Sequence, residues 1–341
     1  MLNTIYRLVA PRRFEACFQN LSLEEDMVLI RPEYLSICHA DQRYYQGLRK
    51  PEVLRKKLPM ALIHEGIGRV VYDGKGEFQK GQRVVMVPNI PIEEDEVIGE
   101  NYLRSSKFCS SGYDGFMRDY VCLPRSRFLP VSDIITNEVS AYTELVSVAY
   151  HAITRFEEIG HKRKEVIGVW GDGNLGYITA LLLKTMHPER KVIIMGVNQE
   201  KLSNFTFADA VYFVDDMPEE LSIDHGFECV GGMYSEGAIN QMIDIIKPEG
   251  TMAILGVSEN NVGINTRMIL EKGLRMFGSS RSGRTDFAGV LKLLEEYPSL
   301  NRYLGTLVHS VIEVHDIKDI VRAFEVDQQK QMGKTILKWN I

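Results

Sequence analysis

The sequence contains few cysteines and no paired cysteine motif. Its 341 residues include five cysteines, which are scattered and never spaced as Cys-x-x-Cys. An odd number of scattered cysteines does not form a disulfide framework and is typical of a reducing compartment. The five are Cys17, Cys38, Cys109, Cys122 and Cys229.

The sequence also lacks a long apolar run, a basic leader and an excess of positive charge. No apolar stretch approaches the roughly 20 residues that cross a membrane. The N-terminus has neither the basic start nor the apolar core of a signal peptide. The net charge of −6 argues against a nucleic-acid binder, which needs a basic face. We therefore expect a cytoplasmic protein that binds neither membrane nor nucleic acid, in which a local basic pocket must meet any anionic substrate.

What the chain does contain is an ordinary globular composition. Hydrophobic residues make up 45% and charged residues 25%, as in soluble domains generally. A chain of 341 residues is too long for one typical core. Two domains are therefore expected.

A glycine-rich loop between two apolar strands carries the strongest single signal. Residues 165–170 read as a buried strand, 171–176 as Gly-Asp-Gly-Asn-Leu-Gly, and 177–186 as an apolar helix before a second strand at 191–195. A lone Gly-x-Gly-x-x-Gly is weak, because glycines also serve ordinary turns. Here its position between strand and helix matches the context that a dinucleotide fold requires.

Each glycine of this loop has a physical role in cofactor binding. Gly171 permits the tight turn, Gly173 lets the backbone approach a pyrophosphate, and Gly176 lets the helix pack on the strand. The start of the helix, at Asn174 and Leu175, offers unpaired N–H groups and a positive dipole end to the phosphates.

The end of the second strand favours NADPH over NADH. An NAD site usually places Asp or Glu about twenty residues along the chain to bind the ribose 2′-hydroxyl. That position holds Gly196, which leaves room for a 2′-phosphate. Asn198 and Lys201 can donate to such a phosphate, although Lys201 can equally be a solvated helix residue.

Three spots in the first half carry polar side chains suited to a metal. They contain Cys38, the pair His64–Glu65, and Glu144. Taken singly, Cys38 reads as a small buried hydrophobe and His64–Glu65 as a satisfied core pair. Cys, His and Glu are all zinc ligands, and their joint appearance upstream of an NADP-type loop favours a catalytic zinc site.

The element pattern predicts an α/β protein in which a β-rich domain is combined with a doubly wound parallel sheet. We place the first domain at residues 1–138 and 285–341 and the dinucleotide-binding domain at 139–284. Short strands are expected at 26–31, 68–72, 81–87 and 116–121 in the first domain, and a final strand at 334–338 returns to it. In the second, further strands are expected at 210–214, 226–230, 251–255 and 274–277, with a helix at 235–246.

The order of these motifs resembles the zinc-dependent medium-chain dehydrogenases over essentially the whole chain. Glu144, where alcohol dehydrogenases carry cysteine, points to the polyol branch. Within it the chain is most similar to the ribulose-5-phosphate reductases that make ribitol 5-phosphate for teichoic acid or capsule. The stretches 227–231 and 247–250 carry the resemblance to the dehydrogenases as a whole. The stretches that carry the resemblance to the reductases are 38–45, 105–106, 115–117, 170–178, 278–283 and 333–339.

The resemblance implies a GroES-like catalytic domain, a Rossmann cofactor domain and a zinc that polarises the substrate carbonyl. Cys38, His64 and Glu144 would hold the zinc, with Glu65 completing its shell or lying beside it. NADPH would reduce D-ribulose 5-phosphate to D-ribitol 5-phosphate, with Tyr44 and Arg281 contacting substrate. Arg281 can instead cap a helix or pair on the surface. A homodimer and a separate cytidylyltransferase partner, for CDP-ribitol synthesis, are implied too.

Two departures from the family pattern matter. Many relatives hold a structural zinc with four closely spaced cysteines, but residues 88–115 offer only Cys109. We therefore expect one catalytic zinc per chain and no structural zinc. Ala40 stands where relatives usually carry a Ser or Thr that relays a proton, so a water, Glu65 or a tyrosine must replace it.

Two rival functions stay open. An NAD(P)-linked dehydrogenase of neutral polyols, of the sorbitol or xylitol type, would use the same zinc and loop, and only phosphate contacts would distinguish it. A zinc-free quinone reductase or NADPH-binding protein would leave Cys38, His64, Glu65 and Glu144 without a common role.

Overall fold

A computed structural model describes all residues, 1–341. The chain forms two compact units. The first unit comprises Met1–Ser147 and Ser282–Ile341, and the second Val148–Arg281. The boundaries expected from the sequence, after residues 138 and 284, stay predictions.

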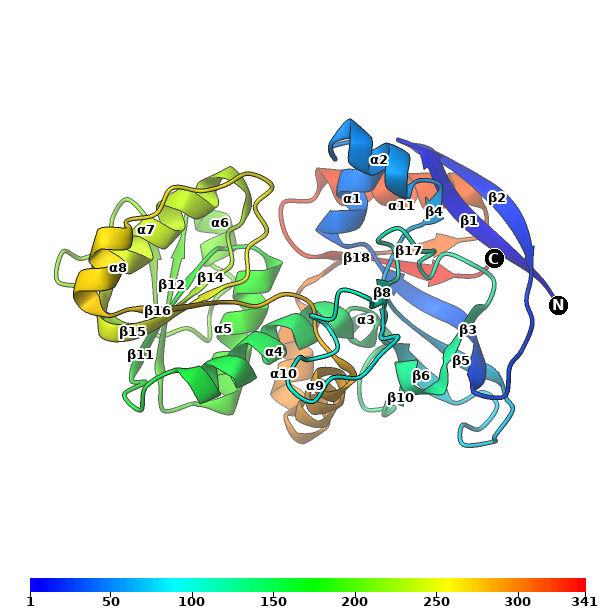
Figure 1. Cartoon of the computed structure of the whole chain (residues 1–341), viewed down its shortest axis with the longest axis horizontal. Coiled ribbons are helices and arrows are strands. Elements are labelled where there is room, and N and C mark those ends of the chain that lie inside the picture. Colours follow the sequence, from blue (N-terminus) through cyan, green and yellow to red (C-terminus); the bar gives the residue numbers. More distant parts are fainter. The chain divides into compact units, whose positions relative to one another are not determined.

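Three sheets build the first unit (Figure 1). The largest has the strand order β10-β6-β5-β3-β18-β17, with β9 also paired to β3. A second has the order β2-β1-β4, and β7 pairs with β8. The strands are β1 (Leu2–Ala10), β2 (Arg13–Asn20), β3 (Met27–Ser36), β4 (Met60–Ala61), β5 (Glu65–Asp73), β6 (Arg83–Met86), β7 (Asn89–Ile90), β8 (Lys107–Phe108), β9 (Val121–Pro124), β10 (Phe128–Pro130), β17 (Val308–Val314) and β18 (Lys334–Trp339).

Short helices join and cover these strands. The final strand returns to the first unit as expected, because β18 pairs antiparallel with β3 and parallel with β17. The helices are α1 (His39–Tyr45), α2 (Pro51–Lys57), η1 (Arg125–Arg127), α3 (Asn137–Ala141), α9 (Arg284–Glu296), α10 (Pro298–Gly305) and α11 (Ile317–Gln329), and α4 (Thr143–Ile159) begins in this unit.

One strand prediction in the first unit is wrong in its extent. Residues 116–121 were expected to form a strand, but β9 begins only at Val121. The buried side chain of Arg118 explains the difference, since it donates to the carbonyl oxygens of Gly115 at 2.8 Å and Asp114 at 2.8 Å. These bonds hold the chain in a tight local turn instead of an extended ladder.

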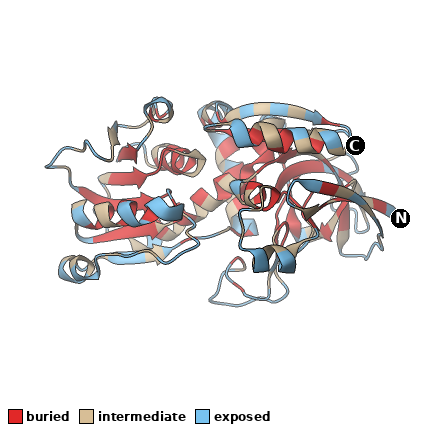
Figure 2. Ribbon diagram, turned by 90° about the horizontal axis from the view of Figure 1, so that it is seen from above, coloured by how far each residue is buried: buried red, intermediate tan, exposed pale blue.

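The second unit is a single parallel sheet of six strands in the order β13-β12-β11-β14-β15-β16. Its four central strands are buried along most of their length (Figure 2), as strands covered on both faces require, whereas the edge strands β13 and β16 are partly or largely exposed. The strands are β11 (Val166–Trp170), β12 (Lys191–Gly196), β13 (Ala210–Phe213), β14 (Ile223–Glu228), β15 (Ile246–Ile254) and β16 (Arg275–Gly278). The helices are α5 (Asn174–Met186), α6 (Gln199–Leu202), η2 (Gly232–Tyr234), α7 (Ser235–Ile245) and α8 (Thr266–Lys272).

This strand order confirms the doubly wound fold that the apolar runs predict. The sheet reverses direction of growth at β11 and β14, which is where open α/β sheets bind ligands beyond their carboxyl ends. The helices of the protein include none that is both long and apolar enough to cross a membrane.

Candidate active site

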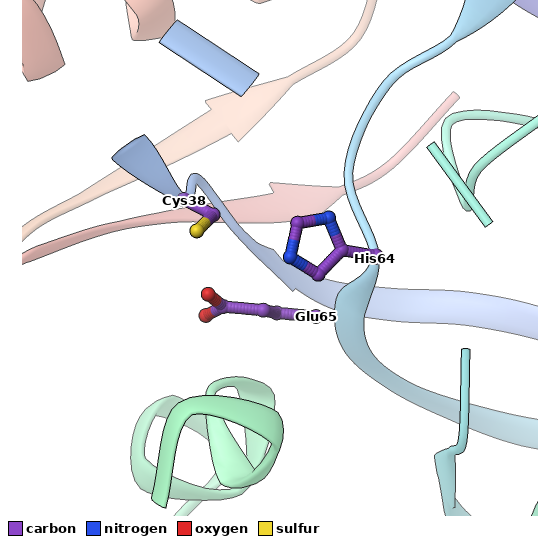
Figure 3. A group of neighbouring side chains, drawn as sticks. All are labelled: Cys38, His64 and Glu65. Atoms are coloured by element: carbon purple, nitrogen blue, oxygen red, sulfur yellow. The ribbon is translucent and has the colours of Figure 1, made fainter. Parts of the chain in front are cut away.

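Three of the four predicted zinc ligands lie together in the first unit. The ligand atoms of Cys38, His64 and Glu65 are all within 4.8 Å of one another. In Figure 3 the sulfur, one ring nitrogen and the carboxylate oxygens point toward a common centre. His64 and Glu65 are buried, while Cys38 is partly exposed. A thiol, an imidazole and a carboxylate at this spacing are a donor set that fits zinc.

Asp41 is the residue that joins the two chain segments of this cluster. Cys38 is the N-cap of α1, and its backbone N–H donates to Asp41 Oδ2 at 3.1 Å. Asp41 Oδ1 accepts from the N–H of Ile63 at 3.0 Å and from the hydroxyl of Ser110 at 2.6 Å. The carboxylate has no exposed surface. It therefore fixes the turn before His64 against the turn that carries Cys38.

Asp41 also faces the ring of His64. Their Oδ1 and Nδ1 atoms are 3.8 Å apart, an electrostatic contact that is too long for a hydrogen bond. A carboxylate behind a histidine ligand orients the ring and raises its basicity. Ile63, just before His64, has a φ of 69°, which costs a β-branched residue on the order of 1–3 kcal/mol. The strain is kept because it turns His64 toward the cluster.

Glu65 is tied to a lysine from the other end of the chain. Lys334 Nζ donates to Glu65 Oε1 at 3.0 Å and to the carbonyl of Ile37 at 2.9 Å, and lies 2.8 Å from Glu65 Oε2. Both side chains are buried. Burial opposes the charge of Lys334, but Glu65 and Cys38 raise its pKa. A metal bound at this cluster would therefore have to share the Glu65 carboxylate with Lys334.

Glu144 lies in the first turn of α4 and is buried. Its carboxylate is outside the group of three ligand atoms, yet it acts on the charge of His64. Burial raises the pKa of Glu144 to about 7, with Glu65 adding to the shift and His64 opposing it. The structure therefore places Glu144 beside the cluster without giving it the ligand distance expected from the sequence.

Burial and neighbouring charges shift the pKa values of the Cys38 thiol and the His64 ring. Burial raises the pKa of the Cys38 thiol, and Glu65 raises it further. Burial disfavours the charged ring of His64, but Asp41 and Cys38 raise its pKa well above the ordinary value. A divalent cation among these groups inverts such shifts and ionises a coordinating thiol.

Three further residues singled out in the sequence lie nearby. Tyr44 is in α1, only 3% exposed, and Ala40 is in the first turn of the same helix. Cys109 is packed in the core of the first unit, and burial raises its pKa to about 11. A thiol in that state is a core hydrophobe.

The glycine loop of the second unit has the geometry expected of it. Gly171 has a φ of 123°. A Cβ on Gly176 would come within 1.9 Å of the carbonyl oxygen of Gly171, so no other residue fits there. A Cβ on Gly173 would meet nothing within 4 Å. That open space at the N-terminus of α5, where Asn174 and Leu175 begin the helix, fits a pyrophosphate.

The space beside Gly196 is not open, which corrects one step of the sequence-based reasoning. A Cβ on Gly196 would come within 2.8 Å of the Asp172 side chain. Asp172 Oδ2 accepts from the backbone N–H groups of Val197 and Asn198, each at 2.8 Å. Gly196 therefore makes room for a carboxylate of the protein, which holds the following loop.

The other predicted contact residues are only partly defined by the structure. The Asn198 side chain caps α6 by accepting from the N–H of Lys201 at 3.0 Å, and its amide nitrogen remains a donor. Lys201 is half-buried. Arg281 has a φ of 59° and belongs to the second unit, whereas the zinc cluster belongs to the first. Its contact with substrate stays a prediction.

Comparison with known proteins places this geometry in a family. The description "Alcohol dehydrogenase GroES-like domain" matches residues 24–133, and "Zinc-binding dehydrogenase" matches residues 175–296. The chain belongs to the zinc-binding, medium-chain dehydrogenase family. Both the family assignment and the pairing of a GroES-like domain with a Rossmann domain are thereby confirmed.

Within this dehydrogenase family the chain has full-length relatives. It is 54% identical to "Ribulose-5-phosphate reductase 1" of Staphylococcus aureus, covering 99% of each chain. It is 53% identical to "Ribulose-5-phosphate reductase" of Bacillus spizizenii, covering 100% of each chain. A crystal structure of S. aureus TarJ in complex with NADPH is similar with a TM-score of 0.90 and 49% identity, covering 100% of each chain.

Sequence reasoning on this dehydrogenase missed three charged residues that organise its sites: Asp41, Lys334 and Asp172. Asp41 had a usable signal, because a buried carboxylate three residues after a cysteine ligand can reach the backbone of that turn. Asp172 stood inside the glycine motif but was read only as a spacer. Lys334 had no signal, since a lysine that begins a strand is normally solvated.

Proposed function

We propose that this chain reduces D-ribulose 5-phosphate to D-ribitol 5-phosphate with NADPH. The observation that carries the proposal is full-length identity of more than half to a ribulose-5-phosphate reductase. The cluster of Cys38, His64 and Glu65 supports it, as does the similarity to TarJ in complex with NADPH. Such a step fits the synthesis of ribitol 5-phosphate for teichoic acid or capsule.

We propose that Cys38, His64 and Glu144 hold the zinc, with Glu65 as a fourth donor or a neighbour. Zinc bound there supplies Lewis-acid polarisation of the substrate carbonyl. The side chain of Asp41 orients His64, and Lys334 fixes the carboxylate of Glu65. Ala40 has no hydroxyl, so a water, Glu65 or a neighbouring tyrosine must deliver the proton to the product oxygen.

The cofactor site is proposed at the glycine loop. Gly171, Gly173, Asn174, Leu175 and Gly176 would cradle the pyrophosphate of NADPH, which supplies the hydride.

Asn198 and Lys201 would receive the 2′-phosphate on a loop that Asp172 holds in place. Residues 1–138 and 285–341 are accordingly the proposed catalytic domain and 139–284 the proposed dinucleotide-binding domain.

The remaining assignments are coarser. We propose Tyr44 and Arg281 as substrate contacts, a homodimer as the assembly, a cytoplasmic location, and a separate cytidylyltransferase as the next enzyme. The last rests on family analogy.

The test is oxidation of NADPH with D-ribulose 5-phosphate, before and after zinc is removed with a chelator. We expect rapid turnover that depends on zinc and that NADH does not match. Activity on unphosphorylated polyols alone would keep the zinc site and refute the phosphate ester as substrate. Activity that survives complete loss of zinc would refute the role of the metal.

A further inference from the structure

Two cations lie over the face of one buried tyrosine in the first unit. The guanidinium carbon of Arg49 is 5.0 Å from the centroid of the Tyr44 ring, and Lys57 Nζ is 5.8 Å from it. Arg49 follows α1, and Lys57 is the last residue of α2. Two cations that share one ring repel each other, and the cation–π attraction at each is worth only about 0.5–2 kcal/mol.

The surroundings of this ring are positive on the side of α1 as well. Arg43 lies in the last turn of α1, and Arg55, Lys56 and Lys57 lie in the last turn of α2. In a chain whose net charge is −6, such a local excess of positive charge indicates a place for an anion.

Lys57 in particular lacks a negative partner. Its ammonium donates to the hydroxyl of Ser111 at 2.9 Å and lies over Tyr44, and no carboxylate pairs with it. It is half-buried, so its charge is only partly solvated. A phosphate oxygen would satisfy the remaining N–H donors of Lys57 with charge-assisted hydrogen bonds.

Two short connections link this cationic cluster to the zinc ligands. The hydroxyl of Ser111 accepts a hydrogen bond from Lys57. The preceding residue, Ser110, donates from its hydroxyl to Asp41 at 2.6 Å. Helix α1 runs from its N-cap Cys38 to Tyr44, a rise of about 9 Å at 1.5 Å per residue. In ribulose 5-phosphate, three carbons and one ester oxygen separate the C2 carbonyl from phosphorus, so the carbon chain together with the carbonyl–metal and phosphate–cation contacts at its two ends spans a separation of this order.

We propose that Lys57 and Arg49 bind the phosphate group of the sugar-phosphate substrate, beside the ring of Tyr44. The inference rests on the proposed function and names the residues that select a phosphorylated over a neutral substrate. Arg49 binds the phosphate through the paired N–H donors of its planar guanidinium group, and Lys57 binds it as a compact positive charge. Tyr44 serves as the surface that keeps the two cations apart.

The test compares Lys57→Met and Arg49→Met with the matched control Lys56→Met. Lys56 is the neighbouring residue of α2 and is exposed. We expect each of the first two changes to raise the KM for D-ribulose 5-phosphate about 10- to 100-fold, the worth of one charge-assisted bond. The kcat/KM for unphosphorylated D-ribulose should stay within about twofold, and Lys57→Arg should restore most of the lost affinity. Lys56→Met should change neither value, and melting temperatures identify any variant that fails to fold.

A binding measurement separates this inference from the proposed function. Isothermal titration with D-ribitol 5-phosphate and with inorganic phosphate is carried out on wild type and variants. The wild type could turn over D-ribulose 5-phosphate while Lys57→Met and Arg49→Met keep both the KM and the phosphate binding of the wild type. That result would overturn the phosphate site and leave the proposed function standing. Absence of wild-type turnover, with phosphate binding that both variants abolish, would overturn the proposed substrate and keep the anion site. A loss of activity equal for ribulose and its phosphate would also overturn the site.

Discussion

The candidate site of the first unit is built from side chains, and that of the second unit is built from backbone. The cluster in the first unit is made of side chains from distant segments, since Lys334 meets Glu65 across 269 positions of sequence. The glycine loop in the second unit is made of backbone within residues 171–176. The first site depends on burial of charge and on the whole tertiary structure, and the second on local conformation. Each site should therefore be disrupted by a different kind of substitution.

The largest expected effect separates the two sites completely. His64→Ala removes a buried donor from the cluster, and we expect loss of bound zinc and a fall in activity of about 10³-fold or more. Binding of NADPH should change little, because the glycine loop shares no residue with the cluster. Zinc content by mass spectrometry and NADPH binding by fluorescence check both statements.

Cys17→Ser is the matched control for this experiment. Cys17 is partly exposed on β2 and should keep both zinc and activity. Retention of stoichiometric zinc by His64→Ala would contradict the assignment of the cluster.

The second-largest effect is expected from substitutions in the glycine loop, where only the space around the backbone changes. Gly176→Ala places a Cβ 1.9 Å from the carbonyl oxygen of Gly171, so loop and helix must separate, at a cost of about 1–3 kcal/mol of stability. Gly173→Ala meets nothing within 4 Å and should melt like wild type while still weakening NADPH binding. Zinc content should stay normal in both. Equal melting temperatures for the two variants would refute the close-approach argument.

A smaller effect is expected where the second unit does use a charged side chain. Asp172→Ala removes the acceptor of two backbone N–H groups, which frees the loop that carries Asn198 and Lys201. We expect NADPH to bind about tenfold more weakly, with a smaller loss for NADH. Asp172→Asn, which keeps an oxygen acceptor, should lie between. If NADPH binds Asp172→Ala unchanged, the loop is held by other contacts.

The smallest effect is the response of the second unit to acid. Glu157 accepts from Lys164 and Arg190. Burial opposes its charge, but Arg190 and Lys164 lower the pKa of Glu157 to about 2. A depressed carboxyl pKa stabilises the fold above about pH 4.5, and that contribution is lost as pH falls toward 2.

Tryptophan fluorescence can follow this acid response, because Trp170 lies in the second unit and Trp339 in the first. In a Trp339→Phe background, we expect Glu157→Gln to flatten the acid limb of the stability curve. An unchanged limb would contradict the role of this pair.

The contrast between the units also explains how far prediction from sequence reached. The parallel strands and the loop were located because apolar runs and glycine spacing are local properties. Cys38, His64 and Glu65 were grouped because cysteine, histidine and glutamate are zinc ligands and occur here upstream of an NADP-type loop, and the family resemblance strengthened that grouping. Asp41 had an unused local signal in its spacing from Cys38. Neither periodicity nor spacing can bring Lys334 into the same site, because its role arises from tertiary contacts. The start of β9 and the filling of the space at Gly196 were missed because side-chain hydrogen bonds decide them.

The pairing of β18 with β3 has a consequence for how the protein is made. Residues 334–339 are synthesised after the whole of the second unit, yet β3 needs them as a neighbour and Glu65 needs Lys334 as a counter-charge. On the ribosome, the second unit can therefore fold before β18 exists. Until then, the first unit exposes the edge of β3, and the Glu65 carboxylate lacks its lysine partner. An open edge of this kind invites pairing with other chains. A nascent chain arrested before residue 334 should thus be the form most dependent on chaperones.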